Sequence, residues 1–226
     1  MNTILLVILA IAPGFAIALF IYRKDSRKHL SLSLLGQCIF YGVISFFISI
    51  GIRLLLQRFS HIEQDNMVHQ MIRAVIFIGL VEEGSKFLFL RGILFRNPHF
   101  KQPFDGIVYS VMIGMSFATV ENLLYILNGN TSTAIIRMFT AIPAHAVFAL
   151  IMGFFIGEAK IFKSSSMLYS FIALFFASLA HGYYDYFLFL NFVPGLWLQT
   201  FISLIIVVII THFAFKLRKD EIIYPE

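Results

Sequence analysis

The sequence has little charge and a single cysteine. Lys, Arg, Asp and Glu make up 13% of its 226 residues, whereas a soluble domain has about 25%. One cysteine excludes an internal disulfide and a cysteine-rich zinc module, and we expect Cys38, which lies in an apolar run, to be a packing residue. Hydrophobic residues make up 59% of the chain, and its mean hydropathy is +0.87. A chain of this length cannot bury so much apolar surface in a soluble fold, so we expect lipid to solvate it.

The apolar runs are nearly continuous over about 20 residues and show no two-residue alternation, which favours helices over a β-barrel. We therefore predict an all-α polytopic bundle that forms one membrane domain over residues 1–226. The N-terminus lacks a positively charged region, so the first run is interpreted as a retained helix and not as a cleaved signal peptide. About seven spans are expected, at approximately 4–22, 30–56, 70–95, 105–128, 135–157, 167–190 and 196–215.

The basic residues fall in alternate connections, which predicts the orientation of the chain in the plasma membrane. The basic connections follow the first, third, fifth and seventh predicted spans, and their residues are Arg23, Lys24, Arg27, Lys28, Arg91, Arg96, Lys101, Lys160, Lys163, Lys216, Arg218 and Lys219. We therefore expect the N-terminus outside and the C-terminus in the cytoplasm. The net charge of +5 is explained by this topology and does not suggest a nucleic-acid partner.

Ionisable side chains lie at membrane depth in four neighbouring predicted spans. Placing each charged side chain there costs about 2.5–3.5 kcal/mol on insertion scales. They are Glu82, Glu83, Lys86, Glu121, His145, His181 and Asp185. The two pairs Glu82–Lys86 and His181–Asp185 are each four residues apart, so each pair shares a helix face. By residue count, Glu82 and Glu83 lie near mid-span and the later acids and histidines in the outer halves. One water-filled pocket that opens outward would contain them all.

Packing offers an alternative explanation for each polar residue taken singly. Glu82–Lys86 would be a buried ion pair, His145 a hydrogen-bonding group between helices, and His181–Asp185 a structural pair. Arg53 and Arg137 lie near span ends and are interpreted as snorkelling anchors. Two further features are read as structural: Asp105 as an N-cap, and Gly153-x-x-x-Gly157 as a close-packing face. Three Glu, two His and one Asp on adjacent spans are together hard to explain as packing.

Four segments resemble the PrsW family of intramembrane proteases, which is related to the type II CAAX prenyl proteases and the bacteriocin-processing (Abi) proteins. They occur in the expected order, and Ala12-Pro13-Gly14 also fits. The segments are Glu82-Glu83-Gly84-Ser85-Lys86, then Asp105-Gly106-Ile107-Val108-Tyr109 through Phe117-Ala118-Thr119-Val120-Glu121-Asn122, then His145 followed by Met152-Gly153-Phe154, and last His181-Gly182-Tyr183-Tyr184-Asp185.

The resemblance implies an intramembrane endopeptidase with a membrane-embedded protein substrate. In the best-known relative this substrate is a single-span anti-sigma factor of a stress response, cut on its extracytoplasmic side. That side agrees with the outward depth argued from the basic residues. The prenyl proteases have a His at the position of Glu121 and an Asn at that of Asp185, which disfavours prenyl-protein activity here.

Peptide hydrolysis needs an activated water, a stabilised oxyanion and a proton for the leaving amine. No Ser/His/Asp or Cys/His set stands out, which leaves a water activated by a carboxylate, by a metal or by both. By analogy with the prenyl proteases, we favour Glu82 as general base without a cofactor. Glu83 would then orient Glu82 or hold Lys86, and His181, its tautomer set by Asp185, would serve the oxyanion or the leaving amine. Glu121 and His145 would complete the polar pocket.

Other mechanisms and functions stay open at this point. His145, His181 and Glu121 would make a His₂Glu zinc site with one open position, although the H-E-x-x-H motif is absent. A transporter or proton relay also uses intramembrane Glu, His and Asp, but paired broken helices and an inverted repeat are not seen. A seven-helix photoreceptor would need a lysine within its last span, and Lys216 lies at the end of that span.

Overall fold

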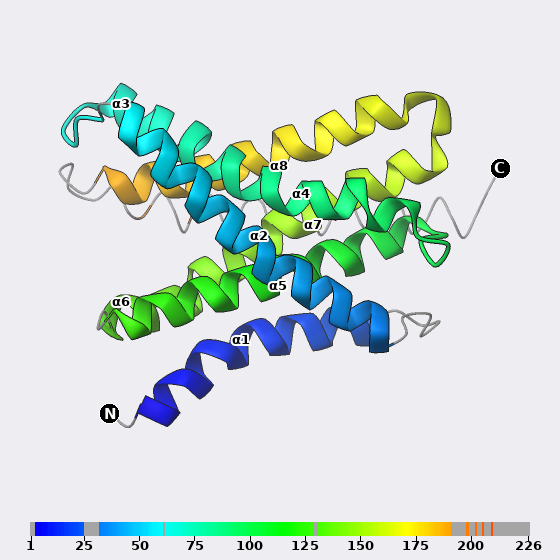
Figure 1. Cartoon of the computed structure of the whole chain (residues 1–226), viewed down its shortest axis with the longest axis horizontal. Helices are drawn as coiled ribbons and strands as arrows, with labels where there is room; N and C mark the ends of the chain where they lie inside the picture. The colour runs from blue at the N-terminus through cyan, green and yellow to red at the C-terminus, as the bar shows by residue number, and fades with distance from the viewer. Residues whose placement is uncertain are drawn as a thin grey trace.

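The computed structural model describes residues 3–24, 32–60, 62–128 and 131–190, together with Leu198, Ile202, Ile205 and Ile209. Helices account for nearly all of these residues, as the sequence predicted (Figure 1). Apart from the four single residues, the predicted span 196–215 lies outside the described part of the chain. The count of seven spans therefore stays a prediction.

Five helical stretches of the described chain are long and apolar enough to cross a membrane, and they match five of the predicted spans. The predicted span 70–95 corresponds to a continuous helical run, α3–η1–α4, whose middle part is a π-helix. The helices are α1 (Thr3–Lys24), α2 (Leu32–Phe59), α3 (Met67–Ile72), η1 (Arg73–Leu80), α4 (Val81–Gly92), α5 (Pro103–Leu127), α6 (Thr131–Phe139), α7 (Ala141–Ile161) and α8 (Ser166–Phe189), with 3-10 turns at Leu94–Arg96 and Lys163–Ser165.

Helix α5 forms the centre of the bundle, and α1, α2, α6 and α7 all pack against it. Its first turn corrects one expectation. Asp105 is not the N-cap: the helix begins at Pro103 after Gln102, and the Asp105 carboxylate accepts hydrogen bonds from the backbone N–H groups of Lys101 and Gln102, both at 2.8 Å. This is the reciprocal arrangement of a capping box, in which the residue three positions after the cap reaches back to the helix start.

Glycines allow α5 and α7 to pack backbone against backbone, which confirms the close-packing role expected of Gly153 and Gly157. A Cβ added to Gly153 would lie 2.6 Å from the carbonyl oxygen of Gly106, and one added to Gly157 would overlap the carbonyl oxygen of Pro103. Cys38 is fully buried in the neighbouring apolar cluster with α2 and α5, as expected of a packing residue.

Replacement of Gly153 by Ala is expected to destabilise the protein by about 1–3 kcal/mol, because the added methyl group meets backbone that cannot move aside. Thermal unfolding of the purified protein in detergent measures the effect. Gly51→Ala is the matched control: an ideal Cβ at Gly51 meets nothing within 4 Å, and alanine is the better helix former. Equal melting temperatures for the two variants would contradict this account of the α5–α7 contact.

The predicted span 135–157 is broken where α6 meets α7. Thr140 leaves helical geometry, with φ −121° and ψ −66°, and separates the two helices. Pro143 lies in the first turn of α7, where the missing N–H of proline is tolerated. Residues 131–139 are therefore a separate short helix, which places Arg137 beside the C-terminal half of α5.

The connections collect at two ends of the bundle, one of which is rich in Lys and Arg (Figure 1). The C-terminal ends of α1, α4 and α7 and the N-terminal ends of α5 and α8 share this end. Its described basic residues are Arg23, Lys24, Arg91, Arg96, Lys101, Lys160 and Lys163. At the opposite end lie the α2–α3 connection, α6 and the C-terminus of α8. This grouping is the one on which the predicted orientation rests, and the orientation itself stays a prediction.

Candidate active site

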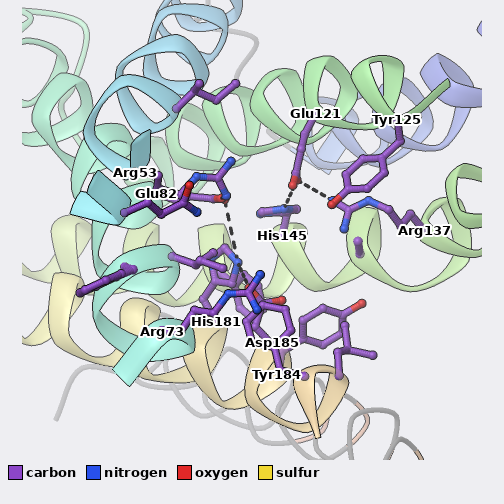
Figure 2. A pocket seen from close by; sticks show the side chains of 18 of the residues that line it. Arg53, Arg73, Glu82, Glu121, Tyr125, Arg137, His145, His181, Tyr184 and Asp185 are labelled. Carbon is purple, nitrogen blue, oxygen red and sulfur yellow. Dashed lines mark hydrogen bonds and ion pairs between the residues drawn. The ribbon is translucent and has the colours of Figure 1, made fainter. Parts of the chain in front are cut away.

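A cavity of about 600 Å³ lies between the helices and reaches the end of the bundle that carries the α2–α3 connection and α6. Ten of its polar and aromatic lining residues are labelled in Figure 2. Five of the seven ionisable residues singled out in the sequence line it: Glu82, Glu121, His145, His181 and Asp185. The other two, Glu83 and Lys86, lie behind this wall and are fully buried.

The π-helix η1 places Glu82 and Glu83 against α8. Gly79 in η1 and Gly182 in α8 remove the side chains where the two helices touch: an added Cβ at Gly79 would lie 2.6 Å from the carbonyl oxygen of Ser178, and one at Gly182 would lie 2.6 Å from Cα of Val75. Because the helices approach so closely, the first turn of α4 brings both carboxylates beside His181. Single π-helical turns inside α-helices often lie at functional sites.

Glu83 joins Lys86 to His181. Lys86 donates a hydrogen bond from Nζ to Oε1 of Glu83 at 2.7 Å, and Nδ1 of His181 lies 2.9 Å from the same oxygen. The ammonium group also lies 4.0 Å from the ring centre of Phe117, a favourable cation–π position. Lys86 therefore pairs with Glu83, three residues before it. The predicted pairing with Glu82 is wrong, although holding Lys86 was one of the two roles predicted for Glu83.

Glu82 is oriented by a residue of another helix. Arg53 of α2 donates from one guanidinium nitrogen to Oε1 of Glu82 at 2.7 Å. The other oxygen, Oε2, is buried and has no hydrogen-bond partner among the described residues. Nε2 of His181 lies 3.9 Å from this oxygen and 3.6 Å from Oδ2 of Asp185. One carboxylate oxygen and one ring nitrogen thus face each other at the cavity wall without a hydrogen bond between them.

Glu121 stands across the cavity from Glu82 and contacts His145 (Figure 2). Its Oε2 lies 3.1 Å from Nε2 of His145 and forms an ion pair with the guanidinium of Arg137 at 2.7 Å. The other ring nitrogen of His145, Nδ1, lies 3.2 Å from Nζ of Lys86. Glu121 therefore has a positive partner and a histidine partner, as Glu83 does.

The two histidines are neighbours and lie perpendicular, with ring centres 5.0 Å apart and an interplanar angle of 87°. Phe148 stacks on His181 at 4.6 Å and fixes the plane of that ring. One ligand atom each of Glu82, His145 and His181 lies within 4.8 Å of the others, and all three residues are buried. This group differs from the predicted metal set, because Glu82 takes the place of Glu121 beside the histidine pair.

Arg53 and Arg137 are not the snorkelling anchors expected from the sequence. Each points into the cavity and forms an ion pair of 2.7 Å with a buried glutamate. One signal in the sequence could have found them: three glutamates and one lysine at membrane depth leave negative charge that needs partners. Arg73, Tyr125 and Tyr184 also line the cavity, and the sequence had predicted a role there for none of them.

Comparison with known proteins identifies a matching protein family and relatives of this chain. Residues 30–213 match the model of a family described as PrsW family intramembrane metalloprotease. A protein named Protease PrsW from Clostridioides difficile (strain 630) is 34% identical over 222 residues, which cover 96% of this chain and 90% of that relative. The protein of the same name from Geobacillus kaustophilus (strain HTA426) is 31% identical over 178 residues, 79% of this chain and 77% of the relative. No solved structure matches the chain.

Proposed function

The chain belongs to the PrsW family of intramembrane proteases, and from that premise we propose that it cleaves its substrate in the cavity at Glu82, His145 and His181. The observation that carries this assignment is the buried Oε2 of Glu82. It has no hydrogen-bond partner among the described residues and faces Nε2 of His181 at 3.9 Å. Buried carboxylate oxygens are normally satisfied, so an unpartnered one at a cavity wall marks a place for a ligand, a water or an ion.

The residues around Glu82 and His181 divide the tasks of peptide hydrolysis between them. Arg53 holds one oxygen of Glu82, so the other points to the cavity, where it accepts the proton of the attacking water. His181, held at Nδ1 by Glu83, presents Nε2 to the same position and donates the proton to the leaving amine. Asp185, 3.6 Å from Nε2, stabilises the charged imidazole.

Glu82, His145 and His181 would also hold the metal ion that the family's description implies. The donor set fits zinc, since His₂Glu is an ordinary catalytic zinc shell. Two observations of the site agree with it: the unpartnered Oε2 of Glu82, and the contact of Nδ1 of His181 with Glu83, the kind of outer carboxylate that orients a ligating histidine. A bound zinc ion would supply a Lewis acid for the scissile carbonyl and for water activation.

A specific observation also favours the mechanism without a metal. Both ring nitrogens of His145 already contact charged side chains, Lys86 at 3.2 Å and Glu121 at 3.1 Å. His145 must give up one of these contacts to bind an ion, whereas Glu82 can act as a base in the arrangement described.

For the substrate we propose a single-span membrane protein of the anti-sigma class, cut on the extracytoplasmic side. One support is the opening of the cavity at the end of the bundle opposite the Lys/Arg-rich end. The other is the resemblance to a family whose best-known member cuts a single-span anti-sigma factor. A transmembrane helix must unwind locally before water can attack it, and the outer edge of a span is where it does so with the smallest loss of lipid-protected hydrogen bonds.

Purified protein in liposomes is expected to cut a single-span reporter in the outer part of its span. The measurement is the mass of the two products, and the control is the same reporter in liposomes without the protein. The site assignment predicts one cut at the depth of His181. Cleavage at the cytoplasmic end of the span would contradict the proposed orientation, and an uncut panel of single-span reporters would contradict the substrate class.

A further inference from the structure

Arg73 is a cation of the cavity wall that has no acidic partner among the described residues. It begins η1, is half-buried, and points toward the cavity beside α8 (Figure 2). Its guanidinium stacks on the ring of Phe189, 4.4 Å from the ring centre, and donates one long hydrogen bond of 3.4 Å to Oε1 of Gln70. A guanidinium carries five N–H donors in a planar fork, so most of the hydrogen-bonding capacity of Arg73 is unused within the described structure.

The other two arginines of the wall differ from Arg73 in this respect. Arg53 and Arg137 are each held at 2.7 Å by a buried glutamate. Asp185, the remaining acid of the wall, lies beside His181, and Arg73 has no ion pair with it. Among the described residues, no acid therefore forms an ion pair with Arg73.

The position of Arg73 is fixed by the protein. Gln70 is 1% exposed, and its amide donates to the carbonyl oxygens of Glu63 and Gln64 in the α2–α3 connection at 3.0 and 3.1 Å. The oxygen of the same amide accepts the hydrogen bond from Arg73, and the ring of Phe189 contacts the guanidinium. A cation held in this way presents its free edge without losing much side-chain entropy on binding.

We propose that Arg73 binds a carboxylate of the substrate and so sets the sequence preference of the protease. This inference rests on the proposed function, because it places the cleaved bond at His181. A carboxylate is the group that the free edge of a guanidinium matches best, by two parallel hydrogen bonds. The substrate is therefore a single-span protein with an acidic residue close to the cleaved bond.

The helix geometry gives the spacing between that acidic residue and the cleaved bond. Phe189, whose ring contacts the guanidinium of Arg73, is eight residues beyond His181 on α8. Eight residues span about 12 Å along a helix. An extended peptide advances about 3.3 Å per residue. The carboxylate is thus expected about three or four residues from the cleaved bond. It lies on the part of the substrate that runs from the cleaved bond toward the open end of the cavity.

The test uses a set of peptides, each with a single Glu at one of six positions on either side of the cleaved bond. The reference for each is the same peptide with Gln at that position. Binding is measured with the Glu82→Gln variant, which does not turn the peptides over, and cleavage with the active protein. Glu at the third or fourth position is expected to bind and react about tenfold better than Gln. The added change Arg73→Gln removes this advantage, Arg73→Lys keeps part of it, and Arg73→Glu transfers it to a peptide with Lys.

Arg58→Gln is the matched control, because Arg58 is an exposed arginine of α2 at the same end that does not line the cavity. Peptides that end at the third or fourth position, with a free or an amidated C-terminus, show whether a main-chain carboxylate is bound as well as a side-chain one. An advantage of Glu that survives Arg73→Gln, or equal binding of Glu and Gln peptides at every position, would overturn the inference. If the peptides bind in an Arg73-dependent way but the active protein does not cleave them, the result would instead count against the proposed function.

Discussion

Replacement of Glu82 by Gln is expected to abolish cleavage while the protein still folds. The loss should be about 10³-fold or more, toward the upper part of the range for removal of a positioned general base. Glutamine has the shape of glutamate and keeps an oxygen for Arg53, which now donates to Oε1 at 2.7 Å. The amide nitrogen takes the place of Oε2, which has no hydrogen-bond partner in the described structure. The substitution therefore breaks no hydrogen bond, and it turns the ion pair with Arg53 into a hydrogen bond to a neutral oxygen.

Two measurements separate the chemical role of Glu82 from a structural one. Initial rates on a single-span reporter in liposomes give the activity, and the melting temperature in detergent gives the stability. Asp65→Asn is the matched control, because Asp65 is an exposed acid of the α2–α3 connection. An active Glu82→Gln variant would refute the site assignment. A variant that is inactive and also unfolded would indicate that the Arg53–Glu82 ion pair is structural.

Hydropathy and motif spacing predicted the parts of this protein that depend on short stretches of sequence. Five predicted spans match helices that are long and apolar enough to cross a membrane. The intramembrane acids and histidines converge on one cavity and the layer behind its wall, as their depth along the spans suggested. A lipid environment explains this success: each ionisable group in a span needs a partner or water, so such groups gather wherever a bundle offers both.

The excess of negative charge in the spans indicates that cationic partners exist, but it does not assign them to individual acids, because the partners come from other helices. Arg53 and Arg137 lie near the ends of predicted spans, where arginine usually reaches to the membrane surface. Which way each side chain turns depends on how α2 and α6 pack on α4 and α5, and the separate helix α6 exists because the chain breaks at Thr140. Neither fact can be predicted from the sequence alone.

Local spacing also left two pairings undecided. Residues three and four apart are both neighbours on a helix, so Lys86 had two candidate acids in Glu82 and Glu83. The structure selects Glu83 because His181 contacts the same carboxylate from α8. In the same way His181 has its short contact with Glu83 at 2.9 Å, and Asp185 lies 3.6 Å from the other ring nitrogen. Tertiary contacts decided between alternatives that the helix alone allowed.

The metal question turns on which carboxylate accompanies the two histidines. The sequence offered Glu121 as the third ligand, and the structure groups Glu82 with the histidines instead. Glu121 is held by Arg137 at 2.7 Å, and an arginine partner lowers its value as a ligand because the positive charges compete for one oxygen. Glu82 also has an arginine, but Arg53 contacts Oε1 and leaves Oε2 free. Arg137 and His145 likewise share one oxygen of Glu121, so what favours Glu82 is that one of its oxygens lies within 4.8 Å of a ligand nitrogen of each histidine.

Zinc content is therefore expected to depend on Glu82, His145 and His181, and to be nearly independent of Glu121. The purified protein should carry about one zinc per chain, and chelation should abolish cleavage until zinc is restored. His145→Ala and His181→Ala each remove one ligand and should lose the metal together with the activity. Glu83→Gln, which alters the carboxylate behind His181, should weaken zinc binding about 10–100-fold, as changes in outer partners of a ligating histidine do.

Metal analysis by mass spectrometry and zinc titration measure these effects independently of cleavage. His99→Ala is the matched control, because His99 is an exposed histidine in the connection before α5. Metal-free protein that cleaves at the full rate, and His145→Ala with unchanged zinc content, would each count against the metal site. The first result would establish the glutamate mechanism, since Glu82 needs no change in its surroundings to act as the base. Loss of zinc on Glu121→Gln with retention on Glu82→Gln would instead restore Glu121 as the ligand. His145 would then bind through Nε2, the ring nitrogen that lies 3.1 Å from Glu121.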